Sequence, residues 1–132
     1  MSATFLAEVS LAADPRLIRG VRLLISSLAA DRGLSMDEIE DLKLAVQEAC
    51  VNRLALGLAQ DRLRIEISDD QNTLVIAVSG DRPGPGNEDE EAALGLSLAE
   101  ALVDGVWTED VGGTERVVLR KSLPPPPVGP AS

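Results

Sequence analysis

The spacing of apolar residues changes along this chain, and that change constrains the fold more than any other feature. Between residues 17 and 28, apolar residues recur at three- and four-residue intervals, which is typical of one face of an amphipathic helix. Apolar and polar residues instead alternate in 62–68, and 74–79 is a short apolar run. Both patterns favour strands. The sequence therefore predicts helices and paired strands in separate blocks of one chain.

Local signals predict where two helices begin and end. The Asp-Pro pair at 14–15 is a helix start, with Asp as the N-cap and Pro at the first position. Gly33 is expected to end that helix. Ser35 then caps a second helix, and Glu38 three residues later completes a capping box. The second helix is expected to run to about Gly57.

The remaining elements complete a domain of helices and strands. We expect a strand near the N-terminus, a third helix after a loop, and two last strands hinged at Gly112–Gly113. These segments are 3–11, 92–104, 106–110 and 114–121. Five strands and three helices predict an α+β fold, a two-layer sandwich in which helices cover one face of a mostly antiparallel five-strand sheet.

Two segments differ in composition from the rest. Residues 80–91, GDRPGPGNEDEE, are rich in Gly, Pro and acidic residues, and we expect a flexible loop there. Residues 124–132 are Pro-rich and are expected to form a disordered tail. The folded domain is therefore expected to span residues 1–123.

Composition limits both the core and the class of function. The chain has 132 residues, of which 45% are hydrophobic and only 2% aromatic, so one domain must build its core from Leu, Val, Ile and Ala. The net charge is −10, which argues against direct nucleic-acid binding because that needs a basic face. An acidic surface suits a basic protein partner, and solubility explains it equally well.

The chain contains one cysteine, Cys50, and no histidine. These counts exclude a disulfide framework, a His-based nucleophile pair and a zinc site built on His or Cys. Cys50 is expected to be a core residue because it lies in an apolar helical stretch. Since no run has the form of a signal peptide or the length of a bilayer span, we expect a cytoplasmic protein without membrane contact.

A carboxylate and an amide stand one turn apart in the second helix. At about 100° per residue, Glu48 and Asn52 lie away from the solvated stripe and among apolar residues. They could bond each other or the backbone, or meet solvent at the edge of the helix. They could instead line a pocket, where an amide oxygen suits Mg²⁺ and a carboxylate can deprotonate an attacking hydroxyl.

Three further features accompany this ExxxN pair in a set order. They are the glycine-rich loop VSGDRPGPG after a strand, LGL at 94–96 and GGT at 112–114. The ordered set resembles the ATP-binding boxes of the GHKL superfamily, the histidine-kinase-like ATPases with the Bergerat fold. Over about residues 3–123 the chain is similar to the RsbW-like anti-sigma factors and serine-protein kinases, most clearly in 41–52 and 112–123.

The resemblance implies roles for individual residues. Glu48 matches the general base toward the serine of a protein substrate, and Asn52 matches the ligand of Mg²⁺ and, through it, of the ATP phosphates. The other matched nucleotide-binding positions are Asp81, Gly84, Gly86, Gly95 and Thr114. Among these, Asp81 stands for the adenine-binding aspartate, and Gly95 for the glycine that lets backbone N–H groups approach phosphate.

The chain departs from the family pattern at five positions. They are Gly80, Arg82, Ala93, Arg53 and Leu56. The first two displace the aspartate and glycine of the adenine loop, so Asp81 matches only by a one-residue shift. The third removes a glycine before the third helix, and the last two replace a small residue and a histidine after Asn52. Weak or lost ATP binding is an expected consequence.

The resemblance implies an anti-sigma factor that regulates transcription by partner switching. It would bind a sigma factor or a STAS-domain anti-anti-sigma protein, and it would phosphorylate a serine of the STAS partner with ATP and Mg²⁺. The alternative is a non-catalytic anti-sigma or STAS-binding module with a degenerate nucleotide pocket. A plain structural domain would require the ordered boxes to be coincidence. A homodimer is a further expectation from the family.

Overall fold

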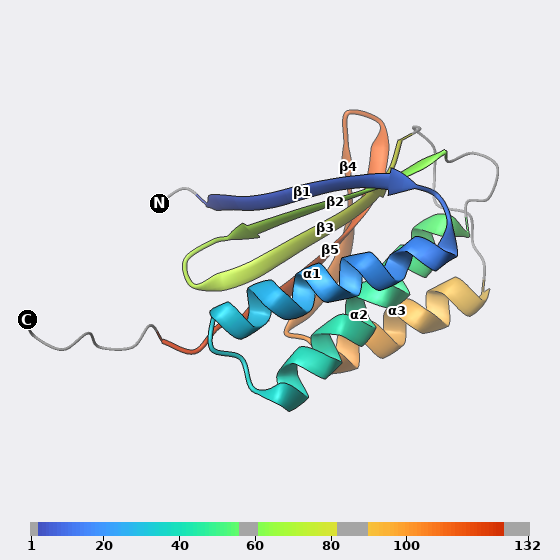
Figure 1. The fold of residues 1–132 in the computed structure, drawn as a ribbon. Coiled ribbons are helices and arrows are strands. Elements are labelled where there is room, and N and C mark those ends of the chain that lie inside the picture. Colours follow the sequence, from blue (N-terminus) through green and yellow to red (C-terminus); the bar gives the residue numbers. More distant parts are fainter. Residues whose placement is uncertain (1–2, 56–60, 82–89, 126–132) are drawn as a thin grey trace, which may run out of the picture.

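The computed structural model describes residues 3–55, 61–81 and 90–125 of the chain. Within these residues, five strands, three α-helices and one short 3₁₀ helix form two layers (Figure 1). The elements are β1 (Thr4–Ala12), η1 (Pro15–Leu17), α1 (Ile18–Asp31), α2 (Met36–Leu54), β2 (Arg62–Asp69), β3 (Thr73–Gly80), α3 (Glu90–Leu102), β4 (Gly105–Val111) and β5 (Thr114–Ser122). The two-layer α+β fold expected from the sequence is confirmed.

A single sheet forms one layer, with the strand order β1-β2-β3-β5-β4. Every neighbouring pair is antiparallel, which confirms the mostly antiparallel sheet. The three α-helices lie together on one face of this sheet (Figure 1). The other face carries no helix from the described residues, and we call it the open face.

Strand alternation separates the two faces of the sheet. In β2 the side chains of Leu63, Ile65 and Ile67 are buried, whereas Arg64 and Glu66 between them are more exposed. Successive side chains of a strand point to opposite faces. One face of the sheet therefore enters the core and the other becomes the open face.

The core between the sheet and the helices is aliphatic, as the composition predicts. Its largest fully buried side chains are Ile25, Leu42, Leu63, Ile65, Ile67, Leu74, Ile76, Leu119, Val21, Val46, Val78 and Val117. The two aromatic residues, Phe5 and Trp107, are 63% and 39% exposed. Folding therefore depends on closely packed aliphatic side chains. A change in the volume of any one of them should lower the free energy of unfolding.

The helix starts follow the sequence signals. The Asp14 carboxylate accepts a hydrogen bond of 2.9 Å from the backbone N–H of Arg16 at the start of η1. Ser35 and Glu38 form the capping box at α2, with reciprocal bonds of 3.2 and 3.0 Å. The Ser35 cap is confirmed, whereas Asp14 caps the short helix η1, and α1 begins after it at Ile18 with no side-chain cap.

The end of the second helix and the start of the third differ from the prediction. Gly33 follows α1 with φ of 85°, a conformation that glycine adopts without strain. The second helix is expected to run to about Gly57, but α2 ends at Leu54 with Ala55 as its C-cap. Residues 82–89 of the loop and 126–132 of the tail lie outside the described residues. Helix α3 begins at Glu90 rather than at 92, because acidic residues that suggested a loop are also favourable at a helix N-terminus.

Candidate functional site

Glu48 and Asn52 lie on α2 inside the helical layer rather than in open solvent. Glu48 is partly buried, and Asn52 is only 8% exposed. The neighbouring stripe that contains Leu42, Val46 and Cys50 is fully buried, and α2 packs against both α1 and α3. The angular offset read from the sequence is therefore real, and both polar groups face protein.

Glu48 lies directly against Gly95 of α3. A Cβ built on Gly95 would overlap the Oε2 atom of Glu48. Glycine inside a helix costs about 1 kcal/mol relative to alanine. The missing side chain gives the Glu48 carboxylate its place beside the α3 backbone.

The helical N–H groups that could bind phosphate are not at Gly95 itself. An α-helix leaves its first four N–H groups without helical partners, and α3 begins at Glu90. Gly95 lies five residues later, roughly 7 Å along the axis at 1.5 Å per residue. In this structure Gly95 provides space for Glu48, while the N–H groups that have no partner within the helix belong to the first turn of α3.

Asn52 is bound by its neighbour Arg53. The Arg53 Nε and Nη2 atoms donate hydrogen bonds of 2.9 and 2.5 Å to the Asn52 Oδ1 atom. Arg53 also donates to the backbone oxygen of Glu115 at 3.2 Å and to its Oε1 atom at 3.3 Å. The guanidinium is 3% exposed, so it joins the end of α2 to the start of β5 within the protein.

These residues do not fit a magnesium site in this arrangement. An amide oxygen has two lone pairs, and both hydrogen bonds to Asn52 Oδ1 come from a cation. Within the described part of the chain, no group of three or more His, Cys, Asp or Glu residues could hold a metal ion. The role of Asn52 as a metal ligand stays a prediction, and no chemical step below depends on Mg²⁺.

Asp81 serves the backbone where β2 begins. Its Oδ1 atom accepts hydrogen bonds from the backbone N–H groups of Asp61 and Arg62, at 2.9 and 3.1 Å. The carboxylate therefore ties the end of β3 to the start of β2. Its role toward adenine stays a prediction, and Gly84 and Gly86 of the same loop lie outside the described residues.

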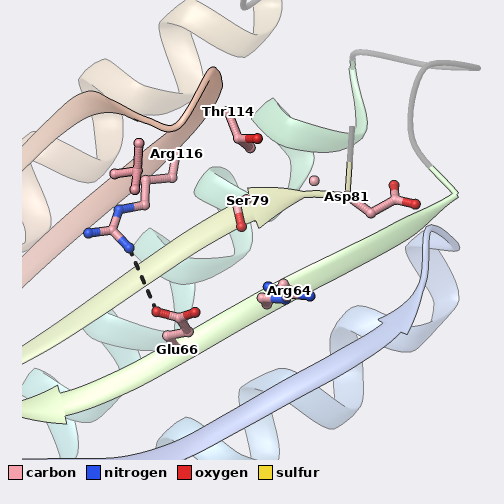
Figure 2. Close-up of a pocket in the computed structure, with 8 residues that line it drawn as sticks. Arg64, Glu66, Ser79, Asp81, Thr114 and Arg116 are labelled. Carbon is pink, nitrogen blue, oxygen red and sulfur yellow. Dashed lines mark ion pairs between the residues drawn. The ribbon is translucent and has the colours of Figure 1, made fainter. Parts of the chain in front are cut away.

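A cavity of about 210 Å³ lies on the open face where β3 ends and β5 begins (Figure 2). Its lining residues are Arg64, Glu66, Ser79, Gly80, Asp81, Val111, Thr114 and Arg116. Arg116 pairs with Glu109 at 2.6 Å and with Glu66 at 3.7 Å. This cavity is smaller than the roughly 300–1,000 Å³ of most small-molecule sites, and its Arg116 cation already has acidic partners.

The predicted nucleotide residues therefore fall on two sides of the sheet. Asp81 and Thr114 line the open-face cavity (Figure 2). Glu48 and Gly95 meet in the helical layer. Alternation along β5 explains the separation, because Glu115 faces α2 and Thr114 before it points the opposite way.

Sequence reasoning missed one part of this site. The sequence pattern assigns no role to Glu115, and it marks Arg53 only as a departure from the family pattern. The available signal was an arginine within the apolar last turns of a helix, which needs a partner when buried. Its partner lies 62 residues away in the sequence, so no local pattern could identify it.

The single thiol belongs to the core and not to the site. Burial raises the pKa of Cys50 to about 12. The thiol is therefore protonated at neutral pH, and the expectation of a core residue is confirmed.

Comparison with known proteins identifies the family. Residues 11–121 match the histidine kinase-like ATPase domain. The chain belongs to this family. It is 31% identical to the serine-protein kinase RsbW of Bacillus subtilis (strain 168) over 136 aligned residues, which cover 88% of this chain and 84% of that one. It is 32% identical to the protein of the same name from Staphylococcus epidermidis, with 75% and 76% covered.

The fold of this histidine kinase-like ATPase domain is also found in a solved structure. The crystal structure of the RsbU and RsbW domains of Rv1364c from Mycobacterium tuberculosis superposes with a TM-score of 0.63 at 22% identity. The match covers 89% of this chain but only 33% of the mycobacterial chain. The family match and the relatives confirm the RsbW-like resemblance, and the superposition confirms the Bergerat fold. In the described parts of the chain, none of the helices has the length and apolar character to cross a membrane.

Proposed function

We propose that this protein is an anti-sigma factor that acts by partner switching and phosphorylates a serine of a STAS-domain anti-anti-sigma protein with ATP. Membership of the histidine kinase-like ATPase family supports nucleotide chemistry. The relatives named serine-protein kinase RsbW support a protein serine as the phosphate acceptor. The sigma factor is the second partner, and the cytoplasm is the compartment where both partners would be met.

One observation carries the catalytic part of the proposal, namely the position of the Glu48 carboxylate against Gly95 on α3. In a protein kinase the general base must lie near the bound phosphates, because the hydroxyl that it deprotonates attacks the terminal phosphorus. The N–H groups in the first turn of α3, which have no partner within the helix and favour phosphate, lie within about one and a half turns of Gly95. The proposed base and the proposed phosphate site therefore adjoin.

The reaction assigns one role to Glu48. Its carboxylate accepts the proton of the serine hydroxyl, the serine oxygen bonds to the γ-phosphorus of ATP, and the bond from that phosphorus to the ADP oxygen breaks. The products are phosphoserine, ADP and a proton that leaves Glu48. We propose Asp81, Gly84, Gly86 and Thr114 as contacts to ATP on the basis of the motif match alone, and Gly95 as the residue that leaves room for the Glu48 carboxylate.

The test is phosphate transfer from γ-labelled ATP to STAS-domain proteins from the same genome. Glu48→Gln keeps the shape of the side chain but cannot accept the proton, so transfer should fall by about 10²–10⁴. Glu40→Gln is the matched control, because Glu40 is exposed on the same helix. Its ion pair with Lys43, at 3.0 Å, lies at the surface. Transfer that is unchanged in Glu48→Gln would contradict the assignment of the base.

A second candidate function is a non-catalytic module that binds the sigma factor and the STAS protein without ATP. Two contacts favour it: Arg53 binds the Asn52 amide oxygen, and Asp81 binds backbone N–H groups. The same assay separates the candidates. Tight partner binding by wild-type protein, with no labelled phosphate transferred to any STAS protein, would favour the binding module.

A further inference from the structure

Asn52 and Arg53 are the two buried polar side chains of the described residues, and they bind each other. Buried charges in proteins need both a partner and satisfied hydrogen bonds. Here the Arg53 guanidinium is 3% exposed, and its carboxylate partner Glu115 is 30% exposed. The Arg53 guanidinium is therefore a buried, paired charge of the interior and not a surface side chain.

The hydrogen bonds of this group leave little freedom for either residue. An arginine carries five N–H donors, and four bonds from Arg53 run to Asn52 and to Glu115. The same bonds account for both lone pairs of the Asn52 amide oxygen. A metal ion could bind that oxygen only after the guanidinium had given up its two bonds to Asn52.

Electrostatics points the same way. A divalent ion at Asn52 would lie within a few ångströms of a fixed positive charge, and like charges at that distance repel strongly when water is excluded. Glu115 already compensates the charge of Arg53 at 3.3 Å. The position that a metal would occupy at Asn52 is thus held by a cation of the chain.

We propose that Arg53 is the resident cation at Asn52, so that nucleotide binding by this chain requires no divalent ion held by that asparagine. The proposal rests on the nucleotide site of the proposed function. Its distinctive consequence is that Mg²⁺ changes nucleotide affinity little in the wild-type protein. Removal of the guanidinium exposes the amide oxygen and makes affinity depend on Mg²⁺.

The experiment is a titration with a fluorescent ATP analogue, carried out once with Mg²⁺ and once with EDTA. Wild-type protein is expected to bind with the same affinity, within about twofold, under both conditions. In Arg53→Ser, Mg²⁺ is expected to raise nucleotide affinity roughly tenfold or more. The reason is that the exposed Asn52 oxygen gains an interaction with the ion that the wild-type protein lacks. Adding Asn52→Ala to Arg53→Ser should remove this gain, because alanine lacks the amide oxygen that would bind Mg²⁺.

Two further variants keep the result interpretable. Arg19→Ser removes an exposed arginine from α1 and should leave the Mg²⁺ dependence as in wild type. Glu115→Gln removes the carboxylate that anchors Arg53 while keeping its shape, and it should produce a smaller gain with Mg²⁺. It also serves in place of Arg53→Ser if circular dichroism shows that Arg53→Ser does not fold.

The outcomes separate this inference from the proposed function. A rise of tenfold or more with Mg²⁺ in wild type, abolished by Asn52→Ala, would overturn the inference and leave the nucleotide function intact. If wild type binds the analogue under neither condition, its nucleotide function fails. Arg53→Ser then decides the inference: Mg²⁺-dependent binding gained by this variant supports it, and continued absence of binding overturns it.

Discussion

The Glu48 carboxylate and the Gly95 backbone lie closer together than any side chain at position 95 would allow. The chain thus gives up helix propensity at one residue to place a carboxylate from another helix. Because Oε2 is the free end of a flexible side chain, a methyl group at position 95 should displace the carboxylate and leave the fold intact.

Alanine substitution at two helix glycines measures this displacement. Gly20→Ala places its Cβ in open space on α1 and should stabilise the protein by about 0.5–1 kcal/mol through helix propensity. Gly95→Ala should show little of that gain, because Glu48 must move. Urea unfolding measures both. In a Glu48→Ala background the gain at position 95 should return, and equal gains at both glycines without that change would contradict the close contact.

The capping box predicts a stability change at the start of α2. Ser35→Ala removes the acceptor for the Glu38 backbone N–H and should lower the free energy of unfolding by about 1 kcal/mol. Ser27→Ala, at an exposed interior position of α1, should have no such cost. Thermal unfolding of the two variants is the measurement, and a Ser35→Ala melting temperature at or above the Ser27→Ala value would refute the cap.

Acid should weaken the same cap. Hydrogen bonds from Ser35, followed by Lys121, lower the pKa of Glu38 below its usual value of 4.5. A carboxyl group with a lowered pKa in the folded state stabilises the protein above the unfolded pKa and loses that contribution as pH falls. The stability difference between wild type and Glu38→Gln should therefore be present at neutral pH and shrink below about pH 4.5. A difference that stays constant down to pH 3 would contradict this linkage.

The buried cation predicts unequal costs for two glutamates of the same hairpin. Glu115→Ala leaves the 3%-exposed Arg53 guanidinium without its carboxylate and should cost about 1–3 kcal/mol. Glu109→Ala removes a partner of the more exposed Arg116 and should cost no more than about 1 kcal/mol. Urea denaturation compares the two variants. Equal costs would mean that the Arg53 contact is no stronger than a surface pair.

Cys50 should not react in the folded protein. Since burial raises its pKa to about 12, a thiol reagent at pH 8 should label it only after denaturation. The unfolded thiol ionises near its usual value of 9.0, so stability should fall as pH rises above 9. Cys50→Ala should lack that loss. Rapid labelling under native conditions would place the thiol at the surface.

Most of the fold could be predicted because its signals are local. The capping box at Ser35, the Asp-Pro helix start at 14–15 and the glycines of the β4–β5 turn each use residues a few positions apart. The alternating residues of 62–68 likewise indicated a strand without any contact from elsewhere in the chain. The helical offset of Glu48 and Asn52 needed only the 3.6-residue period. Such signals depend on bonds within one or two turns of the chain.

The candidate site was harder to predict because its contacts join distant segments. The run Val117–Leu119 is apolar at every position, so it hides which side of β5 faces the core. The phase of Thr114 and Glu115 could therefore not be read from the strand. The Arg53–Glu115 pair depends on that phase and on the packing of α2 over the sheet, and neither is encoded near Arg53.

The aliphatic core has a consequence for optical measurements. With no tyrosine and a single tryptophan, near-ultraviolet emission comes from Trp107 on β4. This indole pairs across the sheet with Val118 and is 39% exposed, away from the helices. The chain therefore carries an intrinsic fluorophore on the face that its helices leave uncovered. A protein that docks there would shift the emission of Trp107 to shorter wavelength without any added label. Loosening of the helical layer would leave that emission nearly unchanged.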